Sequence, residues 1–108
     1  MGIQIRVRLP LADLELERVW SPDDYPALQA DPAEALERQA KIEQRFVDVA
    51  EAAIRRRFPG SSVLVELQSS SEPDVRVFDA DDSEADPEAA EEFVAEHRAS
   101  WVDAAWRF

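Results

Sequence analysis

The stretch that decides the fold is "DPAEALERQAKIEQRFVDVAEAAIRRRFPG", residues 31–60. Asp31 is a preferred N-cap residue, Pro32 suits the first helical position, and Glu34 completes a capping box. Three arginines favour the negative end of the helix dipole, and the closing Pro-Gly pair stops a helix. The sequence therefore predicts one long helix from Pro32 to about Phe58, whose broad apolar face contains Leu36, Ile42, Phe46, Val47, Val49, Ala50, Ala53 and Ile54.

Strand patterns lie on both sides of this helix. Residues 3–9 alternate apolar and polar side chains, and residues 14–20 resume the alternation after "PLAD". Two such runs separated by a short loop predict a hairpin. The runs "VLVELQ" (63–68) and "VRVFDA" (75–80) are separated by "SSSEPD" and predict a second hairpin.

A second helix is predicted at the C-terminal end. The run "DPEAAEE" (86–92) repeats the Asp-Pro start, with Asp86 as the N-cap, and it opens a helix that continues to the end of the chain. Residues 21–29, "SPDDYPALQ", contain two prolines and a Ser-Pro start, and predict a connecting loop or a single helical turn. The resulting order, ββαββα, predicts an α+β fold: a four-stranded antiparallel sheet with two helices packed on one face, in a single domain of residues 1–108.

The charge of the chain is unevenly distributed. Twelve Lys and Arg face 24 Asp and Glu, which gives a formal net charge of −12. Residues 1–58 hold 9 basic and 11 acidic residues (net −2), whereas residues 59–108 hold 3 and 13 (net −10). Such a field repels nucleic acid and anionic lipid and attracts basic proteins. We therefore expect a basic protein partner, no direct nucleic acid and no membrane.

Cysteine usage and the first residues narrow the setting. The chain has no cysteine, which excludes disulfides, thiolate zinc sites and cysteine nucleophiles. Its start, "MGIQIRVRLP", lacks the unbroken apolar stretch of a signal peptide, and no apolar run approaches the length of a membrane span. These features predict a soluble, unprocessed, cytoplasmic protein.

The most acidic stretch, residues 79–92, places eight carboxylates in fourteen positions. We interpret it as a partner-binding acidic surface, because clustered like charge is more easily explained when a partner neutralises it. One alternative is a solvated face that only maintains solubility. The other is a calcium loop, but Glu84 and Ala90 stand where an EF-hand needs glycine and glutamate, so no metal site is predicted. The predicted surface comprises Asp79, Asp81, Asp82, Glu84, Asp86, Glu88, Glu91 and Glu92.

The C-terminal helix is apolar on two sides. The first stripe should pack on the sheet and comprises Ala90, Phe93, Val94, His97, Trp101, Ala104, Ala105 and Phe108. The second lies nearly opposite and comprises Ala95, Ala99, Val102 and Trp106. Because tryptophan is a common interface anchor, this second stripe is predicted to bind a partner or form a homodimer. The alternative is that Trp106 folds back onto its own domain.

No set of residues predicts catalysis or a cofactor. His97 is the only histidine and lies on an apolar stripe, so a structural role is favoured. Glu43 falls between apolar positions of the first helix and would need a partner such as Arg57 if it were buried. Arg6 and Arg8, together with Arg18, are expected on the solvated face of the first hairpin.

These observations predict a small acidic non-enzymatic protein that acts by binding a basic protein. Inhibitors of nucleases and other nucleic-acid-handling proteins, including immunity proteins and DNA mimics, have this combination of charge and size. The alternative function is a self-associating structural or scaffolding subunit that uses the C-terminal helix. Charge neutralisation separates the two, since it weakens binding to a basic partner and leaves self-association unchanged or stronger.

Overall fold

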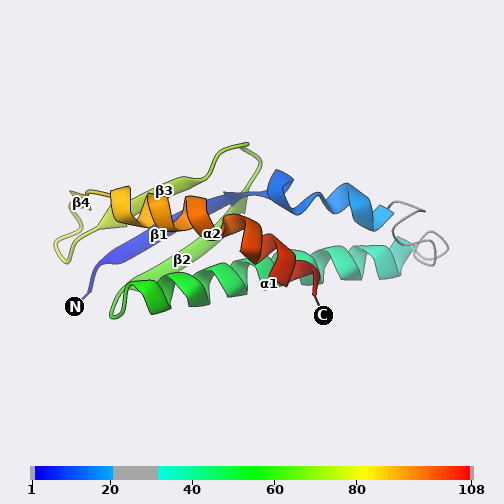
Figure 1. Cartoon of the computed structure of the whole chain (residues 1–108), viewed down its shortest axis with the longest axis horizontal. Helices are drawn as coiled ribbons and strands as arrows, with labels where there is room; N and C mark the ends of the chain where they lie inside the picture. Colours follow the sequence, from blue (N-terminus) through cyan, green and yellow to red (C-terminus); the bar gives the residue numbers. More distant parts are fainter. Residues whose placement is uncertain (1, 21–31, 108) are drawn as a thin grey trace.

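The computed structural model describes residues 2–20 and 32–107 (Figure 1). Four strands form one sheet in the order β2-β1-β3-β4, accompanied by two long α-helices and two short 3₁₀ helices. The α+β class and the four-stranded sheet are therefore confirmed. The elements in chain order are β1 (Gln4–Pro10), η1 (Leu11–Leu14), η2 (Leu16–Trp20), α1 (Pro32–Arg57), β2 (Ser62–Gln68), β3 (Asp74–Phe78), β4 (Glu84–Ala85) and α2 (Glu88–Trp106).

The sheet is mixed, so the prediction of a fully antiparallel sheet is wrong. β1 lies inside the sheet and pairs in parallel with β2, with Ile5 opposite Val63 and Val7 opposite Val65. On its other edge β1 pairs antiparallel with β3, where Val7 lies opposite Val75. The parallel pair arises because the chain leaves β1, returns along α1 and enters β2 in the original direction, the connection that parallel strands require.

The first predicted hairpin is also wrong. Residues 11–20 form η1 and η2 instead of a strand. Residues three apart share one side of a 3₁₀ helix, and Leu11 and Leu14, like Leu16 and Val19, have this spacing. Leu14 and Val19 are fully buried, while Glu15 has a left-handed φ of 49° that interrupts any strand. The same leucines therefore satisfy an alternating pattern in the sequence and a three-residue spacing in the structure.

The strands of the second predicted hairpin exist, but they do not pair with each other. β2 and β3 lie on opposite edges of β1, and residues 69–73 connect them across the end of that strand. Between these two strands, the inward residues of β1 are the most deeply buried: Val7 is 1% exposed and Leu9 is fully buried, against 8% for Val63 and 9% for Val75. The prediction failed because it assumed that neighbouring strands in sequence are neighbours in the sheet.

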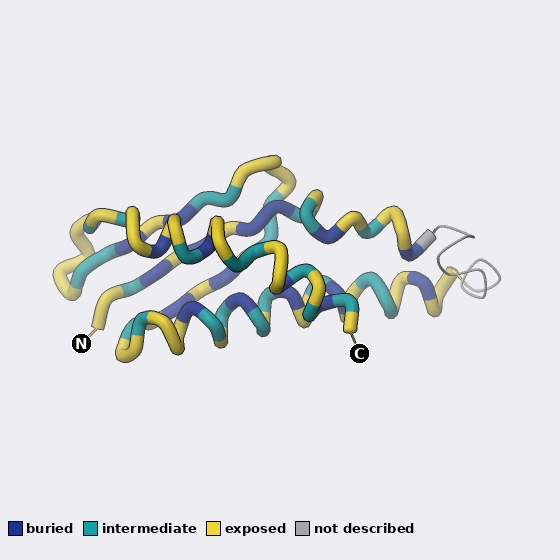
Figure 2. The backbone as a smooth tube through the Cα atoms, in the orientation of Figure 1, coloured by how far each residue is buried: buried dark blue, intermediate teal, exposed yellow. Residues whose placement is uncertain are grey.

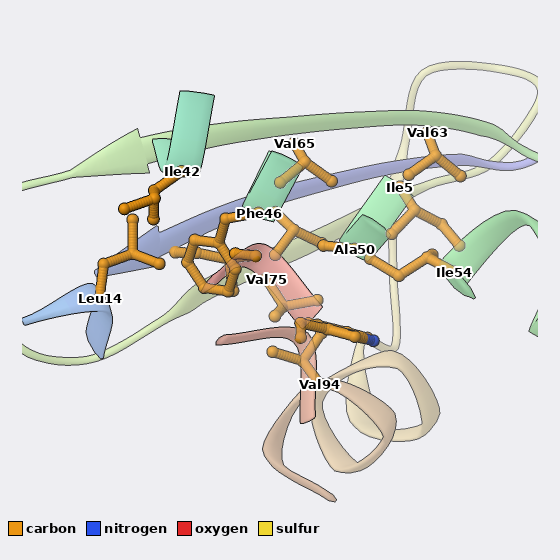
Figure 3. Close-up of a cluster of buried hydrophobic side chains, with 14 of the residues drawn as sticks. Ile5, Leu14, Ile42, Phe46, Ala50, Ile54, Val63, Val65, Val75 and Val94 are labelled. Carbon is orange, nitrogen blue, oxygen red and sulfur yellow. The ribbon is translucent and has the colours of Figure 1, made fainter. Parts of the chain in front are cut away.

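The long helix is confirmed over Pro32–Arg57, whereas its proposed cap, Asp31, lies outside the described residues. Ile42, Phe46 and Ile54 point from α1 into a core that strands and α2 complete (Figure 3). Leu36 was expected on this face but is 57% exposed, so that assignment is wrong. The buried members of the core are all apolar in the described part of the chain. Neither long helix of this part is apolar enough to span a membrane.

Alternate residues of β1, β2 and β3 are buried beneath the two helices, and the residues between them face outward (Figure 2). α2 begins at Glu88, with Pro87 at the N-cap, two residues after the predicted cap. Asp86 nevertheless accepts a hydrogen bond from the Glu88 N–H at 3.0 Å, so its carboxylate satisfies a free donor of the first turn. The helix then packs against α1 and β3 (Figure 1), and its outer side remains exposed (Figure 2).

Candidate partner-binding surface

The predicted acidic surface begins with a turn that Asp79 holds together. Its Oδ1 accepts hydrogen bonds from the backbone N–H groups of Asp81, at 2.9 Å, and Ser83, at 3.1 Å. Asp79 also donates its own N–H to the Ser83 carbonyl at 2.9 Å, and Asp82 adopts a left-handed φ of 63°. Asp79 is therefore a structural residue of the turn. The carboxylates of Asp81, Asp82 and Glu84 are exposed around it.

The acidic surface continues from this turn along the outer side of α2. Glu88, Glu91 and Glu92 are exposed in the first turns of the helix, and Glu96 and Asp103 extend the same side toward its end. Within residues 2–20 and 32–107, no carboxylate of residues 79–92 is in an ion pair. The glutamates at the start of the helix gain from the positive end of the helix dipole. In the turn, the carboxylates of Asp81, Asp82 and Glu84 have no ion pair within the described residues to offset their charge.

Two hollows lie beside this outer side of α2, and we call them together the α2 groove. One has a volume of about 370 Å³ and the other about 330 Å³, and they share Arg98. The first is lined by Asp13, Glu15, Arg98, Ala99, Val102 and Asp103. The second is lined by Glu72, Pro73, Asp74, Val75, Glu91, Ala95 and Arg98. The groove thus combines six carboxylates and one guanidinium with a lining of small apolar side chains.

The predicted apolar anchor is partly brought together with these acids. Ala95, Ala99 and Val102 line the α2 groove, with both alanines exposed and Val102 half-buried. Their small side chains leave room for a partner to approach the helix closely. Sequence reasoning missed the acidic walls contributed by Asp13, Glu15, Glu72, Asp74 and Asp103. No pattern in the sequence could have found them, because η1, the β2–β3 connection and α2 are far apart along the chain.

The single cation of the groove is paired with Asp13. Arg98 Nε lies 3.2 Å from Asp13 Oδ2, and its second nitrogen lies 3.4 Å from Oδ1. The two side chains are only 29% and 17% exposed. Burial raises the pKa of Asp13 above its ordinary value, an effect that outweighs the opposing influence of Arg98 and is reinforced by the nearby charge of Glu72. Arg98 is therefore occupied. Glu15 and Asp74 are also paired, with Arg18 at 3.9 Å and with Arg76 at 3.5 Å. Within the described residues, the groove carboxylates without an ion pair are those of Glu72, Glu91 and Asp103.

Trp106 does not line the α2 groove, unlike the other members of the predicted anchor. Its indole N–H donates a hydrogen bond to the Leu14 carbonyl at 3.0 Å. The guanidinium carbon of Arg18 lies 4.7 Å from the centre of its ring. These contacts attach the end of α2 to η1 and η2, as the fold-back alternative described. Partner binding through Trp106 stays a prediction, but its ring already contacts Leu14 and Arg18 of the same chain.

His97 and Glu43, the two residues considered for a catalytic role, occupy ordinary structural positions. The His97 ring lies 4.4 Å from the Phe93 ring and 6.4 Å from the Trp101 ring, between centroids. Glu43 is half-buried and makes no ion pair within the described ranges 2–20 and 32–107, so Arg57 does not serve as its partner there. In the same part of the chain, no three acidic or histidine side chains are grouped closely enough to hold a metal ion.

Comparison with protein-family models, curated proteins and solved structures gives no match to the chain. Functional inference therefore depends on the surfaces themselves.

The face of the sheet turned away from the helices differs in charge from α2. Arg6 and Arg8 are exposed there, as predicted, and Arg76 lies directly opposite Arg6 on β3. Arg76 pairs with Asp74 at 3.5 Å, and the Arg6 guanidinium lies 5.1 Å from the centre of the Phe78 ring. Glu66 and Asp74 lie on the same face, opposite Arg8 on β2 and β3, so this face mixes three arginines with two carboxylates, whereas the outer side of α2 is mainly acidic. A charge asymmetry of this kind orients an approaching partner.

Proposed function

We propose that this protein acts without catalysis by binding a basic protein partner through the acidic outer side of α2. The observation that carries the proposal is the α2 groove. Its two hollows place Ala95, Ala99 and Val102 among six carboxylates, and the only guanidinium lining them is paired with Asp13. An extended or helical basic segment would gain apolar contact from the alanines and opposite charge from the walls.

The eight-carboxylate stretch supports the same class of partner. It covers the turn that leads into α2 and the first turns of that helix (Figure 1), and one of its members, Glu91, also lines the α2 groove. Negative groups held on fixed elements resemble a row of phosphates in charge. We therefore include nucleic-acid-handling proteins among the proposed partners, in the manner of an inhibitor, an immunity protein or a DNA mimic.

Self-association through α2 is the competing function. Two copies that met at this side of the helix would bring their acidic groove walls together, and like charges at short range cost free energy. The seat of Trp106 against Leu14 and Arg18 also removes much of the apolar surface that a dimer would use. We propose a monomer at physiological salt, and sedimentation velocity at low and high salt tests this directly.

The experiment for partner binding compares three tagged baits in a lysate of the native host. The groove variant carries Glu72→Gln, Glu91→Gln and Asp103→Asn. The control carries Glu17→Gln, Glu37→Gln and Glu66→Gln, which are exposed on other elements and change the net charge equally. A basic protein retained by the wild type and the control, but not by the groove variant, supports the proposal.

Salt and competition sharpen the result. Retention should fall between low and moderate salt, because exposed charge pairs are screened at about 0.15 M. If the partner handles nucleic acid, added duplex DNA should compete with the bait. Equal loss of retention in the two variants would show that only net charge matters. The absence of any basic protein at low salt would overturn the proposal.

A further inference from the structure

A larger cavity lies apart from the α2 groove, and we call it the end pocket. It has a volume of about 520 Å³ and lies where β1 begins, α1 ends and α2 starts. This volume falls within the usual range of about 300–1,000 Å³ for ligand pockets. Its apolar lining comes from Ile3, Ile5, Phe58, Pro59, Val77, Ala89 and Ala90, and two charged residues, Arg57 and Asp86, complete it together with Gly2, Gly60 and Ser61.

The rim of the end pocket is fixed by backbone contacts. Gly60 has a φ of 82°, which a residue with a side chain rarely adopts, and it turns the chain from α1 into β2. Gly2 lies against it so closely that an added Cβ would come within 1.9 Å of the Gly60 carbonyl oxygen. The Ser61 hydroxyl donates to the Phe58 carbonyl at 2.6 Å. The only two glycines of the chain therefore shape this opening.

The aromatic wall of the pocket is also held in place. The Phe58 ring meets the Phe93 ring edge-on, with 6.0 Å between centroids and 83° between planes. On the rim, the Arg57 guanidinium lies 5.0 Å from the centre of the Phe58 ring. An aromatic group entering the pocket would therefore meet a fixed apolar wall. Preformed pockets of this kind lower the cost of ordering a ligand.

Charge decides what kind of apolar group fits. Asp86 belongs to both the end pocket and the acidic surface, and the exposed Glu88 follows it at the start of α2. Residues 74–92 carry nine acidic residues and one arginine, a net charge of −8. Residues 51–62 on the other side carry three arginines and one glutamate, a net charge of +2. The combined field at this end of the molecule favours a ligand with positive charge beside its apolar group.

We propose that the end pocket receives an aromatic side chain that lies between basic residues of the protein partner. This inference rests on the proposed function and adds the residue that anchors the complex. Interfaces are dominated by a few aromatic or arginine residues that fill pockets, with charged groups around them. The end pocket supplies the apolar site, and the acidic surface beside Asp86 supplies the surrounding charge.

The test is a titration of the intact protein with three blocked tripeptides, followed by amide and methyl NMR shifts. The probes are acetyl-Lys-Trp-Lys-amide, acetyl-Lys-Ala-Lys-amide and acetyl-Glu-Trp-Glu-amide. Burial of the indole should make the Lys-Trp-Lys probe bind about tenfold or more tightly than the Lys-Ala-Lys probe. Its shifts should include Ile3, Ile5 and Val77. The Glu-Trp-Glu probe should bind most weakly.

A matched pair of variants locates the effect. Ala89 is exposed and lines the pocket, so Ala89→Leu should narrow the opening and abolish the preference for tryptophan. Ala52→Leu makes the same change on an exposed position of α1 and should leave the preference unchanged. Asp86→Asn keeps an oxygen that can accept the Glu88 N–H and removes a charge. It should weaken both lysine probes and strengthen the Glu-Trp-Glu probe.

The outcomes separate the two proposals. If the two lysine probes bind equally, without shifts at the pocket residues, the end pocket is not the anchor site while binding of basic ligands still stands. The end pocket is likewise excluded as the anchor site if Ala89→Leu has no effect on the preference. If neither lysine probe binds at low salt, the proposed function fails, and the inference that rests on it fails with it.

Discussion

Replacing Trp106 tests whether the end of α2 is attached to its own domain or is free for a partner. Three contributions hold the indole. Its hydrogen bond to the Leu14 carbonyl at 3.0 Å should contribute about 1 kcal/mol, and the Arg18 guanidinium at 4.7 Å about 0.5 kcal/mol. A half-buried indole removes roughly 100 Å² of apolar surface from water, worth about 2.5 kcal/mol. Trp106→Ala should therefore lower the free energy of unfolding by about 4 kcal/mol.

Trp106→Phe separates the hydrogen bond from the apolar contact. Phenylalanine keeps an aromatic face for Arg18 and most of the buried surface, but it cannot donate to the Leu14 carbonyl. We expect a loss of about 1–2 kcal/mol, measured by urea unfolding followed by far-ultraviolet circular dichroism. The adjacent exposed Arg107 provides the control, since Arg107→Ala should change stability by less than about 0.5 kcal/mol.

The result also bears on function. A cost below about 1 kcal/mol for Trp106→Ala, with a cooperative transition, would refute the intramolecular seat and make Trp106 a candidate partner anchor again. If these intramolecular contacts are present, Trp106→Phe should bind the partner as the wild type does, because the Trp106 ring contacts Leu14 and Arg18 and lines neither the α2 groove nor the end pocket. A specific loss of binding in Trp106→Phe, without a loss of stability, would contradict the placement of the anchor in the end pocket.

Three further outcomes are expected from the same unfolding measurements. Phe46→Ala should lower the free energy of unfolding by about 3–5 kcal/mol, because the ring is fully buried. Leu36→Ala, at a site that is 57% exposed, should lower it by less than about 0.5 kcal/mol. Equal losses would contradict the core as described. Gly60→Ala should lower the free energy of unfolding by about 1–2 kcal/mol. The loss comes from the left-handed φ alone, because the added Cβ would meet no atom within 4 Å. An unchanged unfolding midpoint would contradict the left-handed conformation of Gly60. Burial raises the pKa of Asp13 in the folded state, so the folded protein binds this proton more tightly than the unfolded chain does. The proton therefore increases the free energy of unfolding below the unfolded-state pKa. This contribution is lost as pH rises through the folded-state pKa. The stability of the wild type relative to Asp13→Asn should therefore fall from acid toward neutral pH, and a difference that rises with pH would reverse the assigned sign.

Local patterns of the sequence predicted the elements better than their pairing. The helix over Pro32–Arg57 followed from a Pro start, a helical apolar period and a Pro-Gly stop, all of which act within a few residues. The strands β1, β2 and β3 followed from alternation in the same way. Their order did not, because alternation reveals which side of a strand is apolar and not which strand lies beside it.

The 3₁₀ segment shows where a local pattern is ambiguous. Leu14 and Leu16 fit a period of two, whereas Leu11 with Leu14 and Leu16 with Val19 fit a spacing of three, and length does not decide between them. The structure resolves the choice through tertiary competition: β3 pairs with the edge of β1 that residues 14–20 would need. A paired strand could not then form there, and the segment buries Leu14 and Val19 as short helices instead.

The candidate surface depends on whether residues 14–20 form a strand or 3₁₀ helices. Had residues 14–20 formed a strand, Asp13 would have lain in a hairpin loop, and Leu14 would have faced the sheet. As 3₁₀ helices, these residues lie beside α2, where Asp13 forms an ion pair with Arg98 and the Leu14 carbonyl accepts a hydrogen bond from the Trp106 indole N–H. The acidic walls therefore combine residues more than 80 positions apart. Local sequence patterns could identify the charge of residues 79–92, but not the groove that this charge accompanies.

Fold and charge are separable in this protein, and this makes the functional tests interpretable. Among the described residues, the buried core has no charged member, so the carboxylates of the groove and the turn can be neutralised without a change in its packing. Asp79 and Asp86 are exceptions within the acidic stretch, because Asp79 accepts two backbone N–H groups of the turn and Asp86 accepts the Glu88 N–H. A variant that changes Asp81, Asp82 and Glu84 but keeps Asp79 should therefore fold at least as stably as the wild type, since it relieves repulsion and loses no hydrogen bond of the turn. Loss of partner binding in such a variant would then report on recognition and not on unfolding.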